Sequence, residues 1–360
     1  MKVTIIGTGN SACAQASKLV ERGHEVTMVK TSRSQHEENF EALQRQGGIY
    51  YYNQYAKDEE RHFAPIRLFT RDIEEGLDGA EVIMVLTQSL QHKTLAERIG
   101  PFLRAGQIVW LMPGNMGSVY FQQNSRQAVH LLESESTPYD ARITEAGTVH
   151  ILFKNVRNAV AFLHRRDEVM LPTIDSLFGA HKYTRTNIVE SAMHNPNMIV
   201  HTVGSLMSAS RIEQMNGEFW MYRESFSPSV WNVVNALDEE KNQVIRAYGG
   251  QPLAYVEACR WRNEEDLSID PYEVFRSYAR TGGPKGPKDL HTRFIWEDVP
   301  MGLCLLESLA QKAGIDTPIT SALISLANAL LQTDFRANGR TLKKLGLQDL
   351  DIEQIKQYLS

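Results

Sequence analysis

The chain has 360 residues, which is long enough for two domains and for a hydrophobic core that needs no disulfide or metal to stabilise it. Its 38 basic and 43 acidic residues give a formal net charge of −5, which argues against a nucleic-acid partner because phosphate binding needs a concentrated basic surface. Three scattered cysteines fit neither a disulfide framework nor a zinc site, and they favour a reducing compartment. Apolar runs are too short for a bilayer and no signal-peptide pattern is visible, so we expect a cytoplasmic protein that does not bind membranes.

The first half of the chain alternates short apolar, β-branched runs with helical patterns. Strands are expected at residues 3–6, 25–29, 66–69, 82–86 and 108–111, with helices between them at 12–20, 34–46, 72–77 and 90–103. This alternation predicts a parallel sheet covered by helices on both faces. Runs at 149–153 and 159–163 are expected to extend that sheet, and the tyrosine-rich residues 50–55 to be irregular.

From about residue 186 the apolar residues recur at spacings of three and four, which indicates helices. Strand-like alternation is nearly absent there. We therefore expect a doubly wound α/β domain over residues 1–185, followed by an all-helical domain over residues 186–360.

A glycine motif of the form G-x-G-x-x-A follows the first strand and opens the first helix. It consists of Gly7, Thr8, Gly9, Asn10, Ser11 and Ala12. The first glycine allows a tight turn, the second lets the backbone approach a pyrophosphate, and the alanine keeps helix and strand close. Free N–H groups at the helix N-terminus favour an anion. The motif in this context predicts a Rossmann-type dinucleotide site, the alternative being a glycine turn without a nucleotide.

The end of the second strand bears on the choice of cofactor. An acid there would bind the ribose hydroxyls of NAD, whereas an arginine accommodates the 2′-phosphate of NADP. The chain has Lys30, Ser32 and Arg33 at this place and no acid, so NADP is favoured over NAD unless this is merely a solvated loop. Two further loops follow sheet strands at the edge where such sheets bind ligands, and we expect them to line the cofactor: Thr87 and Gln88, then Pro113, Gly114 and Asn115.

Polar residues occur on an apolar helix near the start of the helical domain. If Asn195 caps this helix and Pro196 is its first residue, Asn197 and His201 lie four apart on one face. If the helix instead continues through a kink at Pro196, His194 joins the same face. Such a histidine is usually a satisfied core residue, so this segment alone decides nothing.

A second group of polar residues lies at 291–303 and leads into another apolar helix. Arg293 offers a planar fork that matches a carboxylate. Asp298 either caps the helix or holds a histidine ring in one tautomer. Spacing alone leaves both roles of Asp298 open.

The motifs N-P-N-x-x-x-H-T, R-F-I-W-E-D-V-P-M-G-L and G-I-D-T-P, the last at residues 314–318, together resemble the opine dehydrogenases, the octopine and nopaline dehydrogenase family. The resemblance covers nearly the whole chain, and a departure is Thr202, where the family commonly has proline. It implies that His201 is the catalytic histidine, Asp298 its carboxylate partner and Arg293 the anchor of the oxo-acid carboxylate, with Asn197 one turn before the histidine. His194 remains an alternative to His201.

By this resemblance the substrates are small molecules, a 2-oxo acid and an amino acid or amine, which are condensed to an imine and reduced. A ketopantoate-reductase-like or hydroxyacid dehydrogenase is one alternative, although it would use a lysine that the first turns of the helical domain lack. A protein that senses NADP without catalysis is another. We see no metal site, and the oligomeric state, including a homodimer, stays open.

Overall fold

The computed structural model describes residues 1–33, 35–281, 283 and 285–359, and its chain divides into two compact units. The first unit is Met1–Thr184 and the second is Arg185–Ser360. The first is a doubly wound α/β unit and the second is helical, which confirms the predicted fold class. No helix in the described part of the chain has both the length and the apolar character that a membrane crossing requires.

The first unit is built on a large sheet in which neighbouring strands are mostly parallel. Its spatial order is β11 (Val160–Phe162), β8 (His130–Ser134), β7 (Ile108–Leu111), β6 (Val82–Val85), β1 (Lys2–Ile6), β2 (Glu25–Val29) and β5 (Leu68–Thr70). From β1 the chain proceeds to β2 and β5 on one side and then crosses to β6 on the other. The carboxyl ends of β1 and β6 therefore flank a topological switch point, where open α/β sheets bind ligands.

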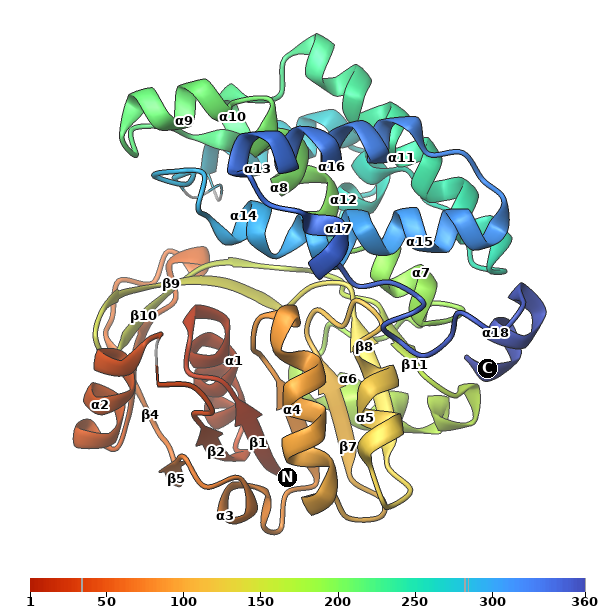
Figure 1. The fold of residues 1–360 in the computed structure, drawn as a ribbon. Coiled ribbons are helices and arrows are strands. Elements are labelled where there is room, and N and C mark those ends of the chain that lie inside the picture. Colours follow the sequence, from red (N-terminus) through yellow and green to blue (C-terminus); the bar gives the residue numbers. More distant parts are fainter. Residues whose placement is uncertain (34, 282, 284, 360) are drawn as a thin grey trace. The chain divides into compact units, whose positions relative to one another are not determined.

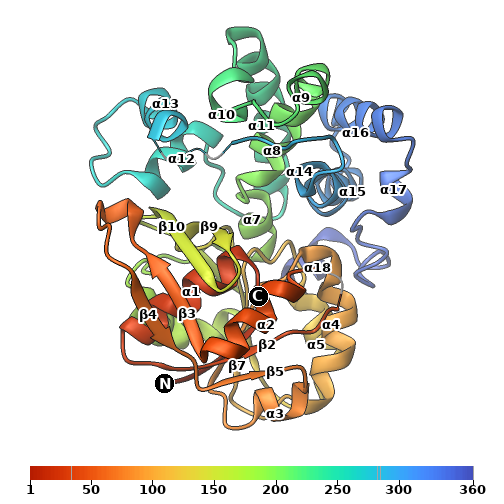
Figure 2. The ribbon, with the colours of Figure 1, turned by 90° about the vertical axis from the view of Figure 1, so that its left-hand side faces the viewer.

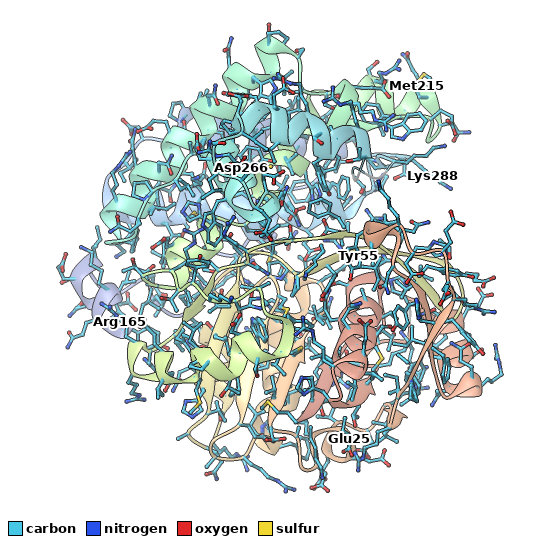
Figure 3. The ribbon with its side chains drawn as sticks, turned by 180° about the vertical axis from the view of Figure 1, so that it is seen from behind. Glu25, Tyr55, Arg165, Met215, Asp266 and Lys288 are labelled. Carbon is cyan, nitrogen blue, oxygen red and sulfur yellow. The ribbon has the colours of Figure 1, made fainter. Side chains whose placement is uncertain are left out.

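Helices cover both faces of this sheet. Helices α4 (His92–Ile99) and α5 (Ser118–Asn124) lie on the face seen in Figure 1, and α1 (Asn10–Glu21) and α6 (Leu171–Phe178) lie on the opposite face seen in Figure 3. The other helical elements of the unit are α2 (Glu37–Gln46), α3 (Ile73–Leu77), η1 (Gln54–Ala56), η2 (Ser89–Gln91), η3 (Gly100–Phe102) and η4 (Arg165–Met170). Ala12, Ala16 and Leu19 of α1 are buried against the sheet, so their small or apolar side chains keep helix and strands close.

A smaller sheet lies over α1 (Figure 2). Its order is β4 (His62–Pro65), β3 (Gly48–Tyr52), β10 (Thr148–Lys154) and β9 (Tyr139–Glu145). β3 and β10 pair in parallel, and the other neighbours are antiparallel.

This smaller sheet corrects two expectations. Residues 50–55 are not irregular throughout, because β3 holds the tyrosines in cross-strand pairs: the Tyr52 and His150 rings are 4.5 Å apart. Residues 149–153 do form a strand, but it pairs with β3 and β9 and does not extend the large sheet. The expectation that residues 159–163 extend the large sheet is confirmed by β11, which runs antiparallel to β8.

The second unit consists of helices gathered around α8 (Asn197–Leu206). Its other elements are α7 (Ile188–Met193), α9 (Ala209–Met215), α10 (Met221–Glu224), α11 (Pro228–Ala247), α12 (Tyr255–Asn263), α13 (Pro271–Thr281), α14 (Arg293–Trp296), η5 (Val299–Leu303), α15 (Cys304–Ala313), α16 (Pro318–Leu331), α17 (Phe335–Asn338) and α18 (Ile352–Tyr358). Helices α10, α11, α14 and α16 all pack on α8. The apolar residues of α8 are thereby buried, and its polar residues require partners within this unit.

Candidate active site

The helix that carries His201 starts after a break in the chain. Helix α7 ends at Met193, and α8 begins at Asn197, directly after Pro196. The amide oxygen of Asn195 accepts a hydrogen bond from the backbone N–H of Asn197 at 3.1 Å, as a capping side chain does. Of the two predicted arrangements, the structure therefore has the one in which a new helix carries Asn197 and His201.

His201 is paired with Asp298. Its Nδ1 atom lies 2.8 Å from Oδ2 of Asp298, and both side chains are almost completely buried. The turn after Asp298, η5, is π-helical, a distortion that is frequent at functional sites. A Cβ atom on Gly302 would lie 2.8 Å from Cγ of Met198, so the glycine lets this turn approach α8 closely. The alternative role of Asp298 as a helix cap is wrong, because its side chain makes no capping bond.

The imidazole of His201 is held from two further directions. The ring of Phe294 stacks on it with centroids 3.7 Å apart and planes inclined by 11°. The hydroxyl of Tyr222 lies 3.4 Å from Nε2. The pairing with Asp298 leaves Nε2 as the nitrogen that faces away from the carboxylate.

Burial sets the protonation behaviour of Asp298. Desolvation raises the pKa of this carboxyl from 3.8 to about 7, and the positive charge of Arg293 works against that increase. An acid that gains and loses its proton near neutrality, bonded to an imidazole, suits a dyad that handles protons.

Arg293 begins α14, four residues before Glu297. Its guanidinium Nε lies 3.6 Å from Oε2 of Glu297, and half of the Arg293 side chain is exposed while that of Glu297 is buried. The buried carboxylate of Glu297 thus forms an ion pair with the Nε side of the Arg293 guanidinium. Arg293 is also close enough to Asp298 to influence its charge. The structure thus gathers Arg293, Asp298 and His201 in one region of the second unit.

The remaining two predicted residues differ in position. Asn197 is half-buried on α8, one turn before His201. His194 lies outside the helix, and its Nε2 atom is 3.2 Å from the carbonyl oxygen of Gln251. Desolvation lowers the pKa of His194 well below its usual value, with Lys241 and Arg185 contributing. The carboxylate partner therefore belongs to His201 and not to His194.

In the first unit, Gly7 forms the tight turn after β1. Its φ is +132°, and a Cβ atom would lie 2.5 Å from the carbonyl oxygen of Leu86, so only glycine fits. Gly9 precedes the first residue of α1 and has no side-chain cap, which leaves the first N–H groups of the helix for an anion. Asn10 accepts a bond from the backbone of Ile143, and Ser11 accepts one from Gln15. Ala12 is buried, and Thr8 is buried with its carbonyl accepting a bond from Asn39.

The two loops predicted to line the cofactor follow β6 and β7. The hydroxyl oxygen of Thr87 is buried and has no hydrogen-bond partner among the described residues, while Gln88 is half-buried. In the second loop Pro113 is half-buried, and Gly114 and Asn115 are buried. The orphaned hydroxyl and the turn at Gly7 fit a ribose and a pyrophosphate at this edge.

Glu133 of β8, which the sequence pattern did not reveal, supports the second loop. Its fully buried carboxylate accepts bonds from the backbone N–H groups of Met116 and Ser118, both at 2.8 Å. A Cβ atom on Gly114 would lie 2.1 Å from its Oε2 atom. The loop is therefore closed onto this buried acid.

Cations gather at the end of β2. Lys30 is buried and donates to the Ser32 hydroxyl at 3.3 Å and to the carbonyl of Gln35. Arg71, which follows β5, donates to the carbonyl of Ser32 at 3.0 Å and pairs with Glu37. Arg33 is exposed. Arg98 of α4 likewise donates to the carbonyl of Thr31 at 3.1 Å, so two arginines missed by the sequence analysis fix the loop that presents Arg33.

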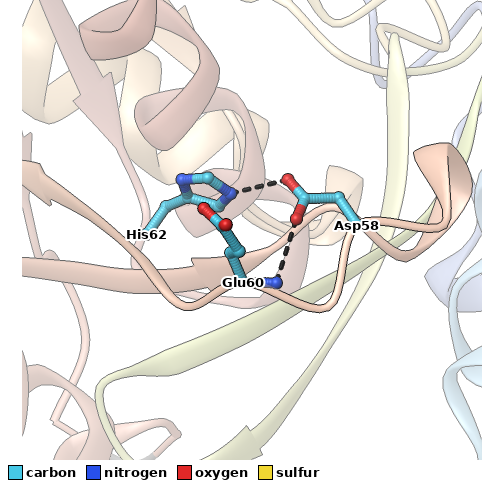
Figure 4. A group of neighbouring side chains, drawn as sticks. All are labelled: Asp58, Glu60 and His62. Carbon is cyan, nitrogen blue, oxygen red and sulfur yellow. Dashed lines mark hydrogen bonds and ion pairs between the residues drawn. The ribbon is translucent and has the colours of Figure 1, made fainter.

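Within the described residues, one group of side chains has the spacing of a metal site, Asp58, Glu60 and His62 (Figure 4). Nε2 of His62 lies 2.7 Å from Asp58, whose other oxygen accepts the backbone N–H of Glu60 at 2.9 Å. These bonds lower the pKa of Asp58 and connect the turn after η1 to β4. We assign no metal to this group.

Comparisons with known proteins divide the chain in the same order as the fold. Residues 184–331 match the family described as NAD/NADP octopine/nopaline dehydrogenase, alpha-helical domain, and residues 2–109 match NADP oxidoreductase, coenzyme F420-dependent. An opine dehydrogenase from Arthrobacter sp. (strain 1C) is 28% identical over 297 residues, which cover 80% of this chain and 81% of that protein.

Solved structures show the same fold at low identity. Octopine dehydrogenase in complex with NADH and agmatine superposes with a TM-score of 0.78 at 18% identity and covers 99% of this chain and 97% of its own. The same enzyme is known with NADH and L-arginine and with NADH and pyruvate. NADP⁺-bound yersinopine dehydrogenase has a TM-score of 0.71 at 12% identity and covers 100% of this chain and 98% of its own.

Proposed function

Since the chain belongs to the opine dehydrogenase family of NAD(P)-dependent oxidoreductases, we propose that Arg293 binds the 2-oxo acid and that His201 and Asp298 catalyse its condensation with an amino group. The observation that carries this proposal is the hydrogen bond between Nδ1 of His201 and Asp298 beside a half-exposed arginine. When bound in the first unit, the dinucleotide supplies the hydride that reduces the imine.

Arg293 binds the carboxylate of the oxo acid with its planar fork. A bidentate ion pair fixes both the position and the orientation of the bound group, and orientation contributes a large part of catalysis. Glu297 lies on the Nε side of the guanidinium, with its Oε2 atom 3.6 Å from Nε.

His201 exchanges protons with the reacting groups through Nε2. It donates a proton to the oxygen of the oxo acid as the amine adds to the carbon. It then takes a proton from the positively charged nitrogen of the carbinolamine and passes a proton to the hydroxyl, which leaves as water. Asp298 accepts the Nδ1 proton in a hydrogen bond and stabilises the imidazolium that each step requires. In the reverse direction the same nitrogen activates the water that hydrolyses the imine.

We favour NADP(H) over NAD(H) as the cofactor. Lys30, Arg33 and Arg71 concentrate positive charge at the end of β2, where a 2′-phosphate would bind. The comparisons include both cofactors, NADH in octopine dehydrogenase and NADP⁺ in yersinopine dehydrogenase.

The test is a matrix of oxo acids and amines assayed with NADPH and with NADH, beginning with pyruvate and L-arginine. We expect oxidation of NADPH only when both an oxo acid and an amine are present. The variant His201→Ala should lose turnover and retain NADPH binding. Near-normal turnover of this variant would contradict the role of His201, and turnover with an oxo acid alone would favour a hydroxyacid dehydrogenase.

We further propose that the protein is cytoplasmic. The support is that its three cysteines are buried thiols that form no disulfide. A homodimer is an expectation that sedimentation of the purified protein at several concentrations would test.

A further inference from the structure

The hydroxyl of Tyr222 lies 3.4 Å from Nε2 of His201, the nitrogen that is not bonded to Asp298. We propose that Tyr222 is a further catalytic residue, which carries a proton from the substrate's ammonium group to Nε2 of His201. This inference rests on the proposed function, because it assigns the step in which the amine becomes a nucleophile.

Tyr222 is placed firmly although its helix, α10, is only four residues long. The preceding residue, Met221, is fully buried, and a Cβ atom on Gly204 of α8 would lie 2.9 Å from its Cγ atom. The following residue, Arg223, donates to the carbonyl of Ala279 at 2.9 Å and to that of Arg280 at 2.6 Å. Both neighbours of Tyr222 are thus anchored, one on α8 and one at the end of α13.

The ring of Tyr222 is supported as well. It meets the ring of Tyr278 edge to face, with centroids 5.3 Å apart, and that of Phe275 at 6.3 Å. The side chain is half-buried, so these ring contacts fix the position of its hydroxyl oxygen. Its distance to Nε2 is longer than a tight O–H···N bond, as is common for catalytic hydrogen bonds before a substrate binds.

The tautomer of His201 fixes the direction of this hydrogen bond. When Asp298 is ionised it accepts the Nδ1 proton, and Nε2 then carries a lone pair and can only accept. The Tyr222 hydroxyl then donates to Nε2, and a phenol oxygen can act as donor and acceptor at once. An ammonium group can be the donor to this oxygen.

The proton transfer balances with groups already present. The ammonium N–H bond breaks and its proton goes to the Tyr222 oxygen, while the hydroxyl proton of Tyr222 goes to Nε2 of His201. Tyr222 is unchanged, His201 is an imidazolium beside Asp298, and the freed lone pair on nitrogen attacks the carbonyl carbon of the oxo acid. The imidazolium then protonates the oxygen of that carbonyl.

Other ionisable groups around His201 are committed elsewhere. Asp298 accepts the Nδ1 proton, and Glu297 is paired with Arg293. Arg293 is always positively charged and cannot accept a proton. Tyr278 contacts Tyr222 through its ring, and Arg223 is bonded to backbone carbonyls. Tyr222 is the group whose oxygen contacts Nε2 directly.

The test compares Tyr222→Phe with wild type and with Tyr272→Phe, a control that removes a hydroxyl from a ring packed on Trp231 in the same unit. We measure kcat/KM for the amine of the most active pair in the matrix, from pH 6.5 to a pH above the pKa of its amino group. Tyr222→Phe should be slower by about 10²-fold near pH 7, within the range of general acid–base effects. The deficit should shrink to less than about 5-fold at the high-pH end, where the amine is already neutral. Tyr272→Phe should match wild type throughout.

A deficit that is the same at every pH, or no deficit, would overturn the relay. The second measurement is the ¹⁵N chemical shift of the His201 Nε2 atom, assigned by its loss in His201→Gln. It should move in Tyr222→Phe and stay fixed in Tyr272→Phe, and an unchanged shift would overturn the contact. If the wild-type protein turns over no pair of oxo acid and amine, the proposed function fails, and the relay fails with it. A change of the Nε2 shift in Tyr222→Phe would then still show the contact between Tyr222 and His201.

Discussion

The Nδ1 atom of His201 lies 2.8 Å from Oδ2 of Asp298, although 97 positions separate the two residues along the chain. One residue is on α8, and the other precedes a π-helical turn that Gly302 allows to approach that helix. The bond fixes the ring so that Nε2 faces away from the carboxylate. The role of Asp298 in catalysis and the effect of its burial on the stability of the fold can be tested separately.

Replacing Asp298 by Asn should lower kcat by about 10²–10⁴-fold, because the imidazolium of His201 loses its carboxylate. The dissociation constant of NADPH, measured by fluorescence titration, should stay within about 2-fold, because Asp298 belongs to the other unit. The exposed Asp349→Asn is the control and should behave like wild type. A variant that retains full kcat would remove Asp298 from the mechanism.

The same substitution should stabilise the protein in a pH-dependent way. Burial raises the pKa of Asp298 from 3.8 to about 7 in the folded chain. Between these values the unfolded chain loses the proton and the folded chain keeps it, so the carboxyl increasingly disfavours folding as the pH rises, and the penalty is complete above pH 7. Asp298→Asn should therefore have a Tm close to that of wild type near pH 4 and a higher Tm at pH 8. A difference in Tm that does not vary with pH would contradict this account.

The local motifs of the first unit were predictable because their geometry is set within a few residues. The turn at Gly7 and the helix after Gly9 follow from a strand, two glycines and an alanine in sequence. β3 was missed in part because its pairing with β10 joins residues about a hundred positions apart, as Tyr50 and Thr148 are.

The candidate active site was predictable only in part. The sequence left His194 as an alternative to His201, and the position of Asp298 in space separates them. The contact of Tyr222 with His201 and the role of Glu133 were not predictable, because each involves groups that are remote in sequence or on the backbone and leave no periodic signal. Arg71 and Arg98 were missed for the same reason, because they donate to backbone carbonyls of the loop after β2.

Replacing Arg293 by Lys should raise KM for the oxo acid and lower kcat/KM by about 10–100-fold, the effect of losing a charge-assisted bidentate contact. A lysine keeps the charge but not the planar fork. The dissociation constant of NADPH should not change. Arg276→Lys, an exposed arginine paired with Glu273, is the matched control. An unchanged KM for the oxo acid would assign its carboxylate to another residue.

Replacing Glu133 by Gln should weaken NADPH binding by about 10-fold or more. The carboxylate accepts hydrogen bonds from two backbone N–H groups, and the NH₂ group of an amide would face one of these N–H groups as a second donor. The loop at residues 113–115 would then lose its fixed position. Circular dichroism should show that the variant is folded. Glu25→Gln, an exposed glutamate paired with Arg67, should bind NADPH as wild type does. If Glu133→Gln is folded and binds NADPH normally, this loop does not depend on Glu133 for its shape.

Replacing Arg33 by Ala should reduce the preference for NADPH. Arg33 is exposed on a loop whose backbone is held by Arg71 and Arg98, so its removal takes away a charged donor and leaves the loop in place. We expect kcat/KM for NADPH to fall about 10–100-fold and that for NADH to stay within about 2-fold, because only the former has a 2′-phosphate. The effect should diminish at high salt, since an exposed charge is screened. Arg45→Ala, at an exposed arginine of α2, should leave both values unchanged. Equal losses with both cofactors would show that Arg33 supports the loop, and no loss with either would place the 2′-phosphate elsewhere.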